Sequence, residues 1–253
     1  MTASMFDLTG KIALVTGSSR GLGSGIAVAL AEAGARVVLH GSQAVPEKVV
    51  ERIAHIGLRP AVVTGDVSTS STCEAIVAAV IERFGSIDVL INNAGTIRRA
   101  PAVEHPEEDW DTVIATNLSS VFHMTKAAGR HMLARGSGKV VNIASLLTFQ
   151  GGITVPSYAA AKGGVGQLTK AFANEWASKG INVNAIAPGY METDNTAALR
   201  ADAQRSRQIL ERIPAGRWGT SSDIGGAAVF LASRASDYVH GHVLVVDGGW
   251  LAR

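Results

Sequence analysis

The sequence predicts an α/β fold in which a doubly wound sheet of seven parallel strands carries helices on both faces. Three observations predict it. Short apolar runs rich in β-branched residues alternate with longer segments of helical periodicity. A glycine-rich turn follows the first apolar run. Hydrophobic residues make up 47% of the 253 residues, which is enough for one well-buried core. Because both faces of a parallel sheet are covered, its strands are expected to be apolar throughout.

The elements follow in order along the chain. Strands are expected over 11–16, 36–40, 61–64, 87–92, 139–144, 181–187 and 243–246. Helices are expected over 21–34 and within the long periodic stretches 106–135 and 157–179. Gly34, Gly136 and Gly180 fall just past the ends of these helices, where a left-handed residue is needed.

The segment 188–219 departs from this pattern. A polar, helix-prone stretch over 193–212 lies between Pro188-Gly189 and Pro214-Ala215-Gly216, so it is expected to form a substrate loop or lid. No linker divides the chain. Residues 1–253 are therefore interpreted as one dinucleotide-binding catalytic domain.

Composition narrows the class of protein. The net charge of +2 and the scattered basic residues give no electrostatic footprint for nucleic acid or for an anionic membrane. The sequence shows neither a signal peptide nor an apolar run of about 20 residues, so a soluble, cytoplasmic protein is expected. Cys73 is the only cysteine, which excludes an internal disulfide, and it is expected to be a buried filler on a helix. The seven histidines show no metal-ligand spacing, so no metal is predicted.

The glycine-rich turn indicates a dinucleotide site. The first strand runs directly into Gly17, Gly21 and Gly23 and then into an alanine-rich helix. Glycines let backbone amides approach a pyrophosphate, and the helix N-terminus adds a positive dipole. The spacing alone also fits a tight turn that needs positive φ, but its place after the first strand favours a Rossmann-type cofactor site. The candidate residues of this turn are Gly17, Ser19, Arg20, Gly21, Leu22 and Gly23.

The end of the second strand bears on the choice of cofactor. NAD-binding folds usually place a carboxylate there, on the ribose 2′-hydroxyl. Here the chain reads His40-Gly41-Ser42. A 2′-phosphate would meet no like charge at this position, and Arg20 and Ser42 can donate hydrogen bonds to it. NADP is therefore slightly favoured over NAD. The alternative is that Arg20 is a solvated surface side chain.

Small polar residues also follow the third, fourth and fifth strands, whose carboxyl ends line the ligand crevice of such a sheet. Taken singly each group is a common turn, and their recurrence favours ligand contact. The candidate cofactor contacts here are Asp66, Val67, Asn93, Ala94 and Gly95. Ser145 closes the fifth strand, where its hydroxyl can polarise a carbonyl or simply cap a turn.

Tyr158 and Lys162 begin the helix that follows Ser145. Residues four apart share a helix face, so the Lys162 ammonium can lie near the Tyr158 phenol and favour its ionised form. This spacing also occurs by chance in many helices. In the expected topological order, Ser145, Tyr158 and Lys162 together indicate proton and hydride transfer at a carbon that bears an oxygen.

With these residues assembled, the chain resembles the short-chain dehydrogenase/reductase family over its whole length. The motifs that carry the resemblance are Thr16-Gly17-x-x-x-Gly21-x-Gly23, Asp66, Asn92-Asn93-Ala94-Gly95, Asn117, Ser145, Tyr158-x-x-x-Lys162 and Pro188-Gly189. The resemblance implies a homotetramer built on the two long helices and the C-terminal strand and tail.

The resemblance also implies roles for these residues. Tyr158 would be the general acid/base. Lys162 would hold the nicotinamide ribose and lower the pKa of that tyrosine, and Ser145 would orient the substrate oxygen. Asn117 would anchor a proton-relay water. Asp66 and Val67 would bracket the adenine, and Pro188, Gly189 and Thr193 would lie beside the nicotinamide.

Within the family, the segments Phe149-Gln150-Gly151-Gly152, 213–219 and 247–253 resemble the sugar-acid dehydrogenases. Because guanidinium groups suit carboxylates, the Arg98-Arg99 pair and Arg217 are expected to bind a carboxylated sugar, and the predicted substrate residues are Arg98, Gln150 and Arg217. The alternative is that the Arg98-Arg99 pair is solvated or lies at a subunit contact.

The same fold also serves two other functions, against which the residues can be compared. Reduction of a 3-oxoacyl thioester would need a basic patch for its carrier, and no concentrated run of Lys or Arg supplies one. A non-catalytic dinucleotide sensor should lack one of Ser145, Tyr158 or Lys162, and this chain has all three.

Overall fold

The computed structural model describes residues 4–253 and contains a seven-stranded parallel sheet with the strand order β3-β2-β1-β4-β5-β6-β7. The strands are β1 (Ile12–Val15), β2 (Arg36–Gly41), β3 (Ala61–Thr64), β4 (Val89–Asn92), β5 (Gly138–Ile143), β6 (Ile181–Pro188) and β7 (Val243–Val246). The predicted fold is confirmed, with strand ends shifted by a residue or two at most. The order reverses between β1 and β4, which places a ligand crevice at their carboxyl ends.

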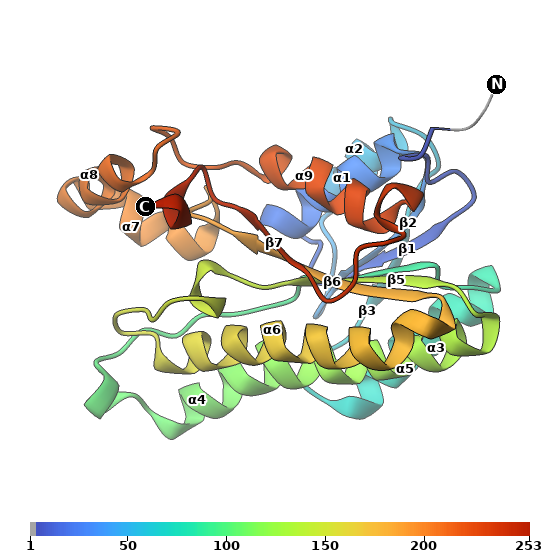
Figure 1. Cartoon of the computed structure of the whole chain (residues 1–253), viewed down its shortest axis with the longest axis horizontal. Coiled ribbons are helices and arrows are strands. Elements are labelled where there is room, and N and C mark those ends of the chain that lie inside the picture. The colour runs from blue at the N-terminus through green and yellow to red at the C-terminus, as the bar shows by residue number, and fades with distance from the viewer. Residues whose placement is uncertain (1–3) are drawn as a thin grey trace.

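Helices cover both faces of the sheet (Figure 1). One layer holds α1 (Gly21–Glu32), α2 (Glu47–Ala54) and α9 (Ser221–Ala232), and the other holds α3 (Ser70–Phe84), α5 (Ser120–Arg135) and α6 (Pro156–Trp176). Alternate residues of β1 face the two helix layers. Ala13 and Val15 pack with α1 and α9, whereas Ile12 and Leu14 pack with α3 and α5. The core is therefore two apolar layers separated by the sheet.

The stretch 106–135 is helical, as predicted, but it is not one regular helix. It consists of α4 (Glu107–Ile114), a π-helical segment Ala115–Ser119 and α5. Such π-bulges are often found at functional sites, and this one contains Asn117. The predicted left-handed residues are confirmed: Gly136 has φ +66° and Gly180 has φ +80°.

The polar segment after β6 is helical as well. It forms a short turn at Asp194–Thr196, α7 (Ala197–Ala201) and α8 (Ala203–Arg212). In Figure 1, α7 and α8 stand at one end of the molecule, beside the C-terminus. Ile209 fixes α8 to the body of the protein, because it is buried and packs in a cluster with Trp218 and Trp250.

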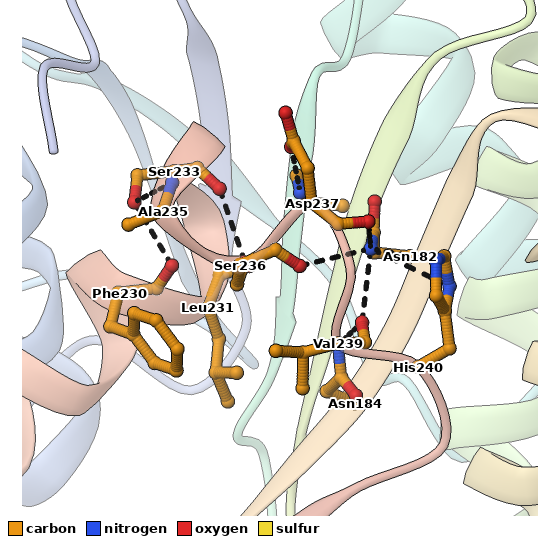
Figure 2. A network of polar contacts seen from close by, with 11 residues as sticks. Asn182, Asn184, Phe230, Leu231, Ser233, Ala235, Ser236, Asp237, Val239 and His240 are labelled. Atoms are coloured by element: carbon orange, nitrogen blue, oxygen red, sulfur yellow. Dashed lines mark hydrogen bonds and ion pairs between the residues drawn. The ribbon is translucent and has the colours of Figure 1, made fainter. Parts of the chain in front are cut away.

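Two buried asparagines of β6 position the loop between α9 and β7 (Figure 2). The Asn184 side chain donates to the oxygen of Val239 at 2.8 Å and accepts from the nitrogen of His242 at 3.0 Å. The Asn182 amide nitrogen lies 3.0 Å from the oxygen of Asp237 and 3.0 Å from that of Val239. These contacts give hydrogen-bond partners to carbonyls of the loop that leads into β7, which pairs with β6.

Cys73 lies on α3 and is fully buried, as predicted, and burial raises the pKa of its thiol to about 11. None of the helices described combines the length and the hydropathy needed to cross a bilayer. Among residues 4–253, no group of three or more His, Cys, Asp or Glu side chains is arranged to hold a metal ion.

Candidate active site

The glycine-rich loop packs tightly against the end of β4. Gly17 has φ +62°, and a Cβ atom there would lie 2.7 Å from the Cα of Ala94. A Cβ atom on Gly23 would lie 2.4 Å from the backbone oxygen of Gly17. Real side chains do not tolerate such contacts, so both positions require glycine. The loop between β1 and α1 therefore has one tightly determined shape.

Polar side chains fix this loop to the segment after β4. Thr16 Oγ1 accepts hydrogen bonds from the backbone nitrogens of Asn93 at 3.0 Å and of Ala94 at 3.1 Å. The Asn93 side chain donates to the oxygen of Gly17 at 3.0 Å. Asn92 points the other way, into the core, where it donates to Thr125 and Asn142.

His40, which the sequence did not single out as a site residue, holds the same loop from the other side. Its Nδ1 accepts from the backbone nitrogen of Gly17 at 3.1 Å, and its Nε2 lies 2.9 Å from the oxygen of Gly65. Because a carbonyl only accepts, Nε2 carries the proton and the ring is neutral. Burial lowers the pKa of His40, against the opposing effects of the Gly65 carbonyl and the Asp66 charge.

Two cavities open at the carboxyl ends of the strands. We call the first, of about 280 Å³, the glycine-loop cavity, and the second, of about 610 Å³, the large cavity. Among the residues common to both are Leu22, Tyr158 and Thr193, so the two cavities meet at Tyr158. The predicted cofactor residues Gly17, Ser19, Arg20, Gly21, Leu22, Gly23, Ser42, Asp66, Val67, Asn93, Ala94, Gly95, Tyr158, Lys162 and Thr193 all line the glycine-loop cavity, and Pro188 and Gly189 line the large one.

The residues of the glycine-loop cavity fit a dinucleotide. The first turn of α1 has no side-chain cap and no acidic residue, so its free N–H groups are available to a pyrophosphate. No carboxylate follows β2, where the chain reads Gly41-Ser42. Arg20, at the mouth, forms an exposed salt bridge with Asp194 at 3.2 Å. This pair joins the glycine-rich loop to the segment after β6.

Lys162 lies beneath the junction of the two cavities. Its buried Nζ donates to the backbone oxygen of Ile143 at 2.6 Å and lies 5.6 Å from the centroid of the Tyr158 ring. Burial lowers the pKa of Lys162 to about 8, because a desolvated ammonium is disfavoured. The two side chains therefore share one face of α6, as their spacing predicts.

The prediction about the pKa of Tyr158 needs correction. Burial raises this pKa, while a hydrogen bond with Ser145 and the charge of Arg99 lower it. Lys162 does not lower it, because the pKa of Lys162, about 8, lies below that of Tyr158, so the lysine has lost its charge at the pH where the phenol ionises. Within the protein alone, burial outweighs the neighbouring groups, and the phenol is a weaker acid than usual.

Ser145 completes this group. It caps the short turn Leu146–Thr148, and its Oγ accepts from the nitrogen of Leu147 at 3.2 Å. The Thr148 hydroxyl donates to the backbone oxygen of Lys162 at 2.9 Å, which ties the turn to α6. Ser145 and Tyr158 line the large cavity together, so the structure brings Ser145, Tyr158 and Lys162 into one place.

Asn117 lies outside both cavities. It is fully buried, and its side chain accepts from the nitrogen of Thr96 at 2.8 Å and donates to the oxygen of Thr96 at 2.8 Å. The expected role of Asn117 in anchoring a proton-relay water therefore stays a prediction, and its side-chain amide is not free for it. Both ends of the amide are used to position the segment after Gly95.

Two of the three predicted substrate residues do not line the large cavity. Arg98 pairs with Asp109 at 3.3 Å and does not line the large cavity. Arg217 forms a bidentate pair with Asp223, at 2.7 and 2.8 Å, and lines a separate cavity of about 180 Å³. Each guanidinium is therefore neutralised by a nearby carboxylate. Only Gln150 lines the large cavity as predicted.

Of the guanidinium groups that do line the large cavity, the sequence reasoning named only Arg99, beside Arg98, and missed the two on α8. The lining groups are those of Arg99, Arg205 and Arg212. None forms a salt bridge with a carboxylate of residues 4–253, and no Asp or Glu of that range lines the cavity. The seven-residue spacing of Arg205 and Arg212 is the signal that could have placed them on one helix face.

A glycine-loop site at the switch point of a parallel sheet, joined to a Ser-Tyr-Lys group, defines a dinucleotide-dependent oxidoreductase. A family model described as enoyl-(acyl carrier protein) reductase matches residues 17–251. The chain belongs to the short-chain dehydrogenase/reductase family, as its motifs indicate, and is an oxidoreductase that acts on CH–OH groups.

Relatives with close sequences cover its whole length. The 2-dehydro-3-deoxy-D-gluconate 5-dehydrogenase of Escherichia coli strain K12 is 54% identical and covers 100% of both chains. The protein of the same name from Bacillus subtilis is 55% identical and covers 98% of this chain and 97% of its own. A crystal structure of a gluconate 5-dehydrogenase from Burkholderia cenocepacia, in complex with NADP and tartrate, is 42% identical with a TM-score of 0.93 and covers 98% of each chain.

Proposed function

We propose that this enzyme transfers hydride between a nicotinamide dinucleotide and a secondary alcohol or ketone of a sugar acid of the 2-deoxygluconate, keto-deoxygluconate or gluconate type. One observation carries the proposal: the cavity that holds Ser145 and Tyr158 presents three guanidinium groups without carboxylate partners and no acidic side chain from residues 4–253. Such a cavity favours an anion. The names of the relatives, which are sugar-acid dehydrogenases, support the same substrate class.

The glycine-loop cavity would hold the dinucleotide, whose nicotinamide accepts or supplies the hydride. The uncapped first turn of α1 would bind the pyrophosphate. Asp66 and Val67 would lie beside the adenine, and Pro188, Gly189 and Thr193 beside the nicotinamide. Lys162 would hold the nicotinamide ribose.

Tyr158 would exchange a proton with the substrate oxygen. In oxidation it takes the alcohol proton, and in reduction it returns a proton to the carbonyl oxygen. Ser145 would donate a hydrogen bond to the same oxygen and stabilise negative charge as it develops. Asn117 would anchor a proton-relay water through a group other than its side-chain amide, because both ends of that amide bind Thr96.

NADP is the proposed preferred nucleotide. No carboxylate follows β2 to repel a 2′-phosphate, and Ser42 and Arg20 line the cavity at that end. To bind the phosphate, Arg20 would exchange its exposed pair with Asp194 for the ligand. The relative from Burkholderia cenocepacia was crystallised with NADP. A Ser42→Asp substitution should raise the Kd for NADP by about tenfold or more while changing that for NAD little, because it adds a like charge. Equal changes for both nucleotides would contradict the preference.

The function is tested by initial rates with NADP and NAD against 2-deoxygluconate, gluconate, their keto forms, a neutral ketose and a 3-oxoacyl thioester. The ratio of kcat/KM values identifies the substrate class. Higher values for sugar acids than for the neutral ketose are expected. Faster reduction of the thioester, or nucleotide binding without any turnover, would reject the proposed function.

The proposal includes a cytoplasmic homotetramer whose segment 188–219 acts as a lid. Trp110 of α4 and Phe122 of α5 are 42% and 39% exposed, and Phe122 stacks on Phe172 of α6. An apolar surface on these long helices supports association through them. Light scattering on the purified protein measures the assembly, and a monomer at micromolar concentration would contradict it.

A further inference from the structure

We propose that α8 carries the carboxylate-binding site, with Arg205 and Arg212 gripping the substrate's carboxylate while Arg99 serves the reacting end. This inference rests on the proposed function and deepens it. It assigns the charged group of the substrate to one helix and the reacting oxygen to another part of the cavity. Neither arginine of α8 was among the predicted site residues.

The spacing on α8 sets the direction of these side chains. Arg205, Gln208, Ile209 and Arg212 all line the large cavity. They stand at positions i, i+3, i+4 and i+7, which share one face of a helix. Ile209 is 1% exposed and packs against the body of the protein, so it anchors this face, on which Arg205 is half-buried and Arg212 is exposed. Arg207 is exposed and does not line the cavity.

Neither guanidinium is neutralised by a neighbour. The hydrogen-bond partner of the Arg205 side chain is the neutral Gln208 oxygen, at 3.3 Å. The Arg212 guanidinium lies 4.0 Å from the centroid of the Trp250 ring. A guanidinium over an aromatic face keeps its N–H groups free for a planar, bidentate carboxylate. The pair therefore offers an anion site without a resident anion among the described side chains.

Surrounding contacts hold this site in place. The Trp250 indole donates to the Gln150 oxygen at 3.4 Å, and the Arg253 side chain donates to the backbone oxygen of Arg212 at 3.3 Å. The C-terminal turn thus fixes the end of α8 from which Arg212 extends. Arg212 keeps one geometry because both its ring partner and its backbone are restrained.

Arg99 is placed for a different task. It donates to the backbone oxygen of Asn195 at 3.4 Å, and its charge acts on Tyr158. A carboxylate bound at Arg99 would cancel this charge beside the phenol. In this proposal α8 binds the acid group, whereas Arg99, on the loop after β4, lines the same cavity as Tyr158 and is left for the reacting end.

The experiment compares Arg205→Gln, Arg212→Gln and the control Arg207→Gln, which lies on the same helix but outside the cavity. Each variant is assayed with gluconate and with gluconamide, which lacks the charge. We expect kcat/KM for gluconate to fall about 10- to 100-fold in the two cavity variants, mainly through KM, because a charge-assisted pair is lost. The value for gluconamide should change less than about threefold, and Arg207→Gln should resemble wild type.

Binding is measured independently of turnover by titrating gluconate into the holoenzyme and following tryptophan fluorescence, with thermal melts to verify folding. Weaker binding of gluconate in Arg205→Gln and Arg212→Gln supports the α8 site. Wild-type affinity in both variants, equal losses for acid and amide, or no gluconate binding by wild type would overturn it. Rejection of the proposed function would instead come from the wild-type substrate panel, in which a neutral ketose or a thioester would be turned over faster.

Discussion

The Lys162 ammonium donates a hydrogen bond to the backbone oxygen of Ile143, the last residue of β5, at 2.6 Å. This contact ties the first turns of α6 to the carboxyl end of the sheet. It sets the height of Tyr158 above the strand ends, because Tyr158 lies one turn earlier on the same helix. The buried ammonium has a pKa of about 8, far below the 10.5 of a free lysine.

Replacing Lys162 by Met should alter stability with a definite pH dependence. Between pH 8 and 10.5 the unfolded chain binds a proton at this lysine that the folded chain has lost. The free energy of unfolding of the wild type therefore rises with pH across this window through Lys162, and that contribution is lost as pH falls through 8. Urea unfolding of the wild type and of Lys162→Met at pH 7.5 and pH 10 measures this pH-dependent contribution to the free energy of unfolding. An identical pH dependence in Lys162→Met would contradict the burial of the charge.

Tyr158→Phe should lower kcat by about 10²- to 10⁴-fold, because it removes the group that exchanges the proton. The Kd for NADPH should stay within about threefold of wild type. Tyr238→Phe is the matched control, since Tyr238 is 100% exposed and lines neither the glycine-loop cavity nor the large cavity. The raised pKa of Tyr158 predicts that the oxidation rate increases with pH above neutrality. A flat profile would argue against this phenol as the base.

His40→Ala should weaken nucleotide binding by about tenfold. The substitution removes the acceptor of the Gly17 N–H and so loosens the loop that would cradle the pyrophosphate. NADPH fluorescence titrations measure the effect, with His55→Ala as the control because His55 is exposed on the surface.

The same residue predicts an acid limit for binding. Burial lowers the pKa of His40 below the ordinary value of 6.5, so the neutral ring that accepts from Gly17 persists below that pH and is lost as pH falls through the folded value. A protonated ring cannot accept from Gly17. Affinity in the wild type should therefore fall at acid pH more steeply than in His40→Ala. Parallel curves would show that His40 does not hold the loop.

Arg217→Gln should leave kcat/KM for sugar acids within about twofold and should reduce acid stability. The bidentate pair with Arg217 holds the pKa of Asp223 well below its usual range. The resulting gain in the free energy of unfolding is present above the pKa of Asp223 in the unfolded chain. It disappears as pH falls through the lower pKa of Asp223 in the folded protein. The acid unfolding midpoint of the variant, followed by circular dichroism, should shift to higher pH. A large loss of substrate affinity would show that Arg217 does bind the substrate.

Much of the fold follows from local pattern. Strands such as 61–64 and 243–246 were placed to the residue, because a run of β-branched residues between glycine or polar turns has few alternatives. The π-helical break at Ala115–Ser119 was not predicted. Its residues have ordinary helical periodicity, and the extra residue in the turn is stabilised by the contact of Asn117 with Thr96, which lies 21 residues away in sequence.

By itself, the sequence determined the parallel sheet, the glycine-loop site and the group formed by Ser145, Tyr158 and Lys162. The order of strands and helices along the chain and the helix periodicity are local patterns, and they place these residues at the carboxyl ends of the strands. Only the tertiary structure decided which arginines are available to a substrate. Arg98 and Arg217 meet carboxylates, whereas Arg205 and Arg212 do not. A guanidinium at the end of a long side chain reaches partners that are set by packing, so its pairing depends on distances between elements that no local pattern encodes.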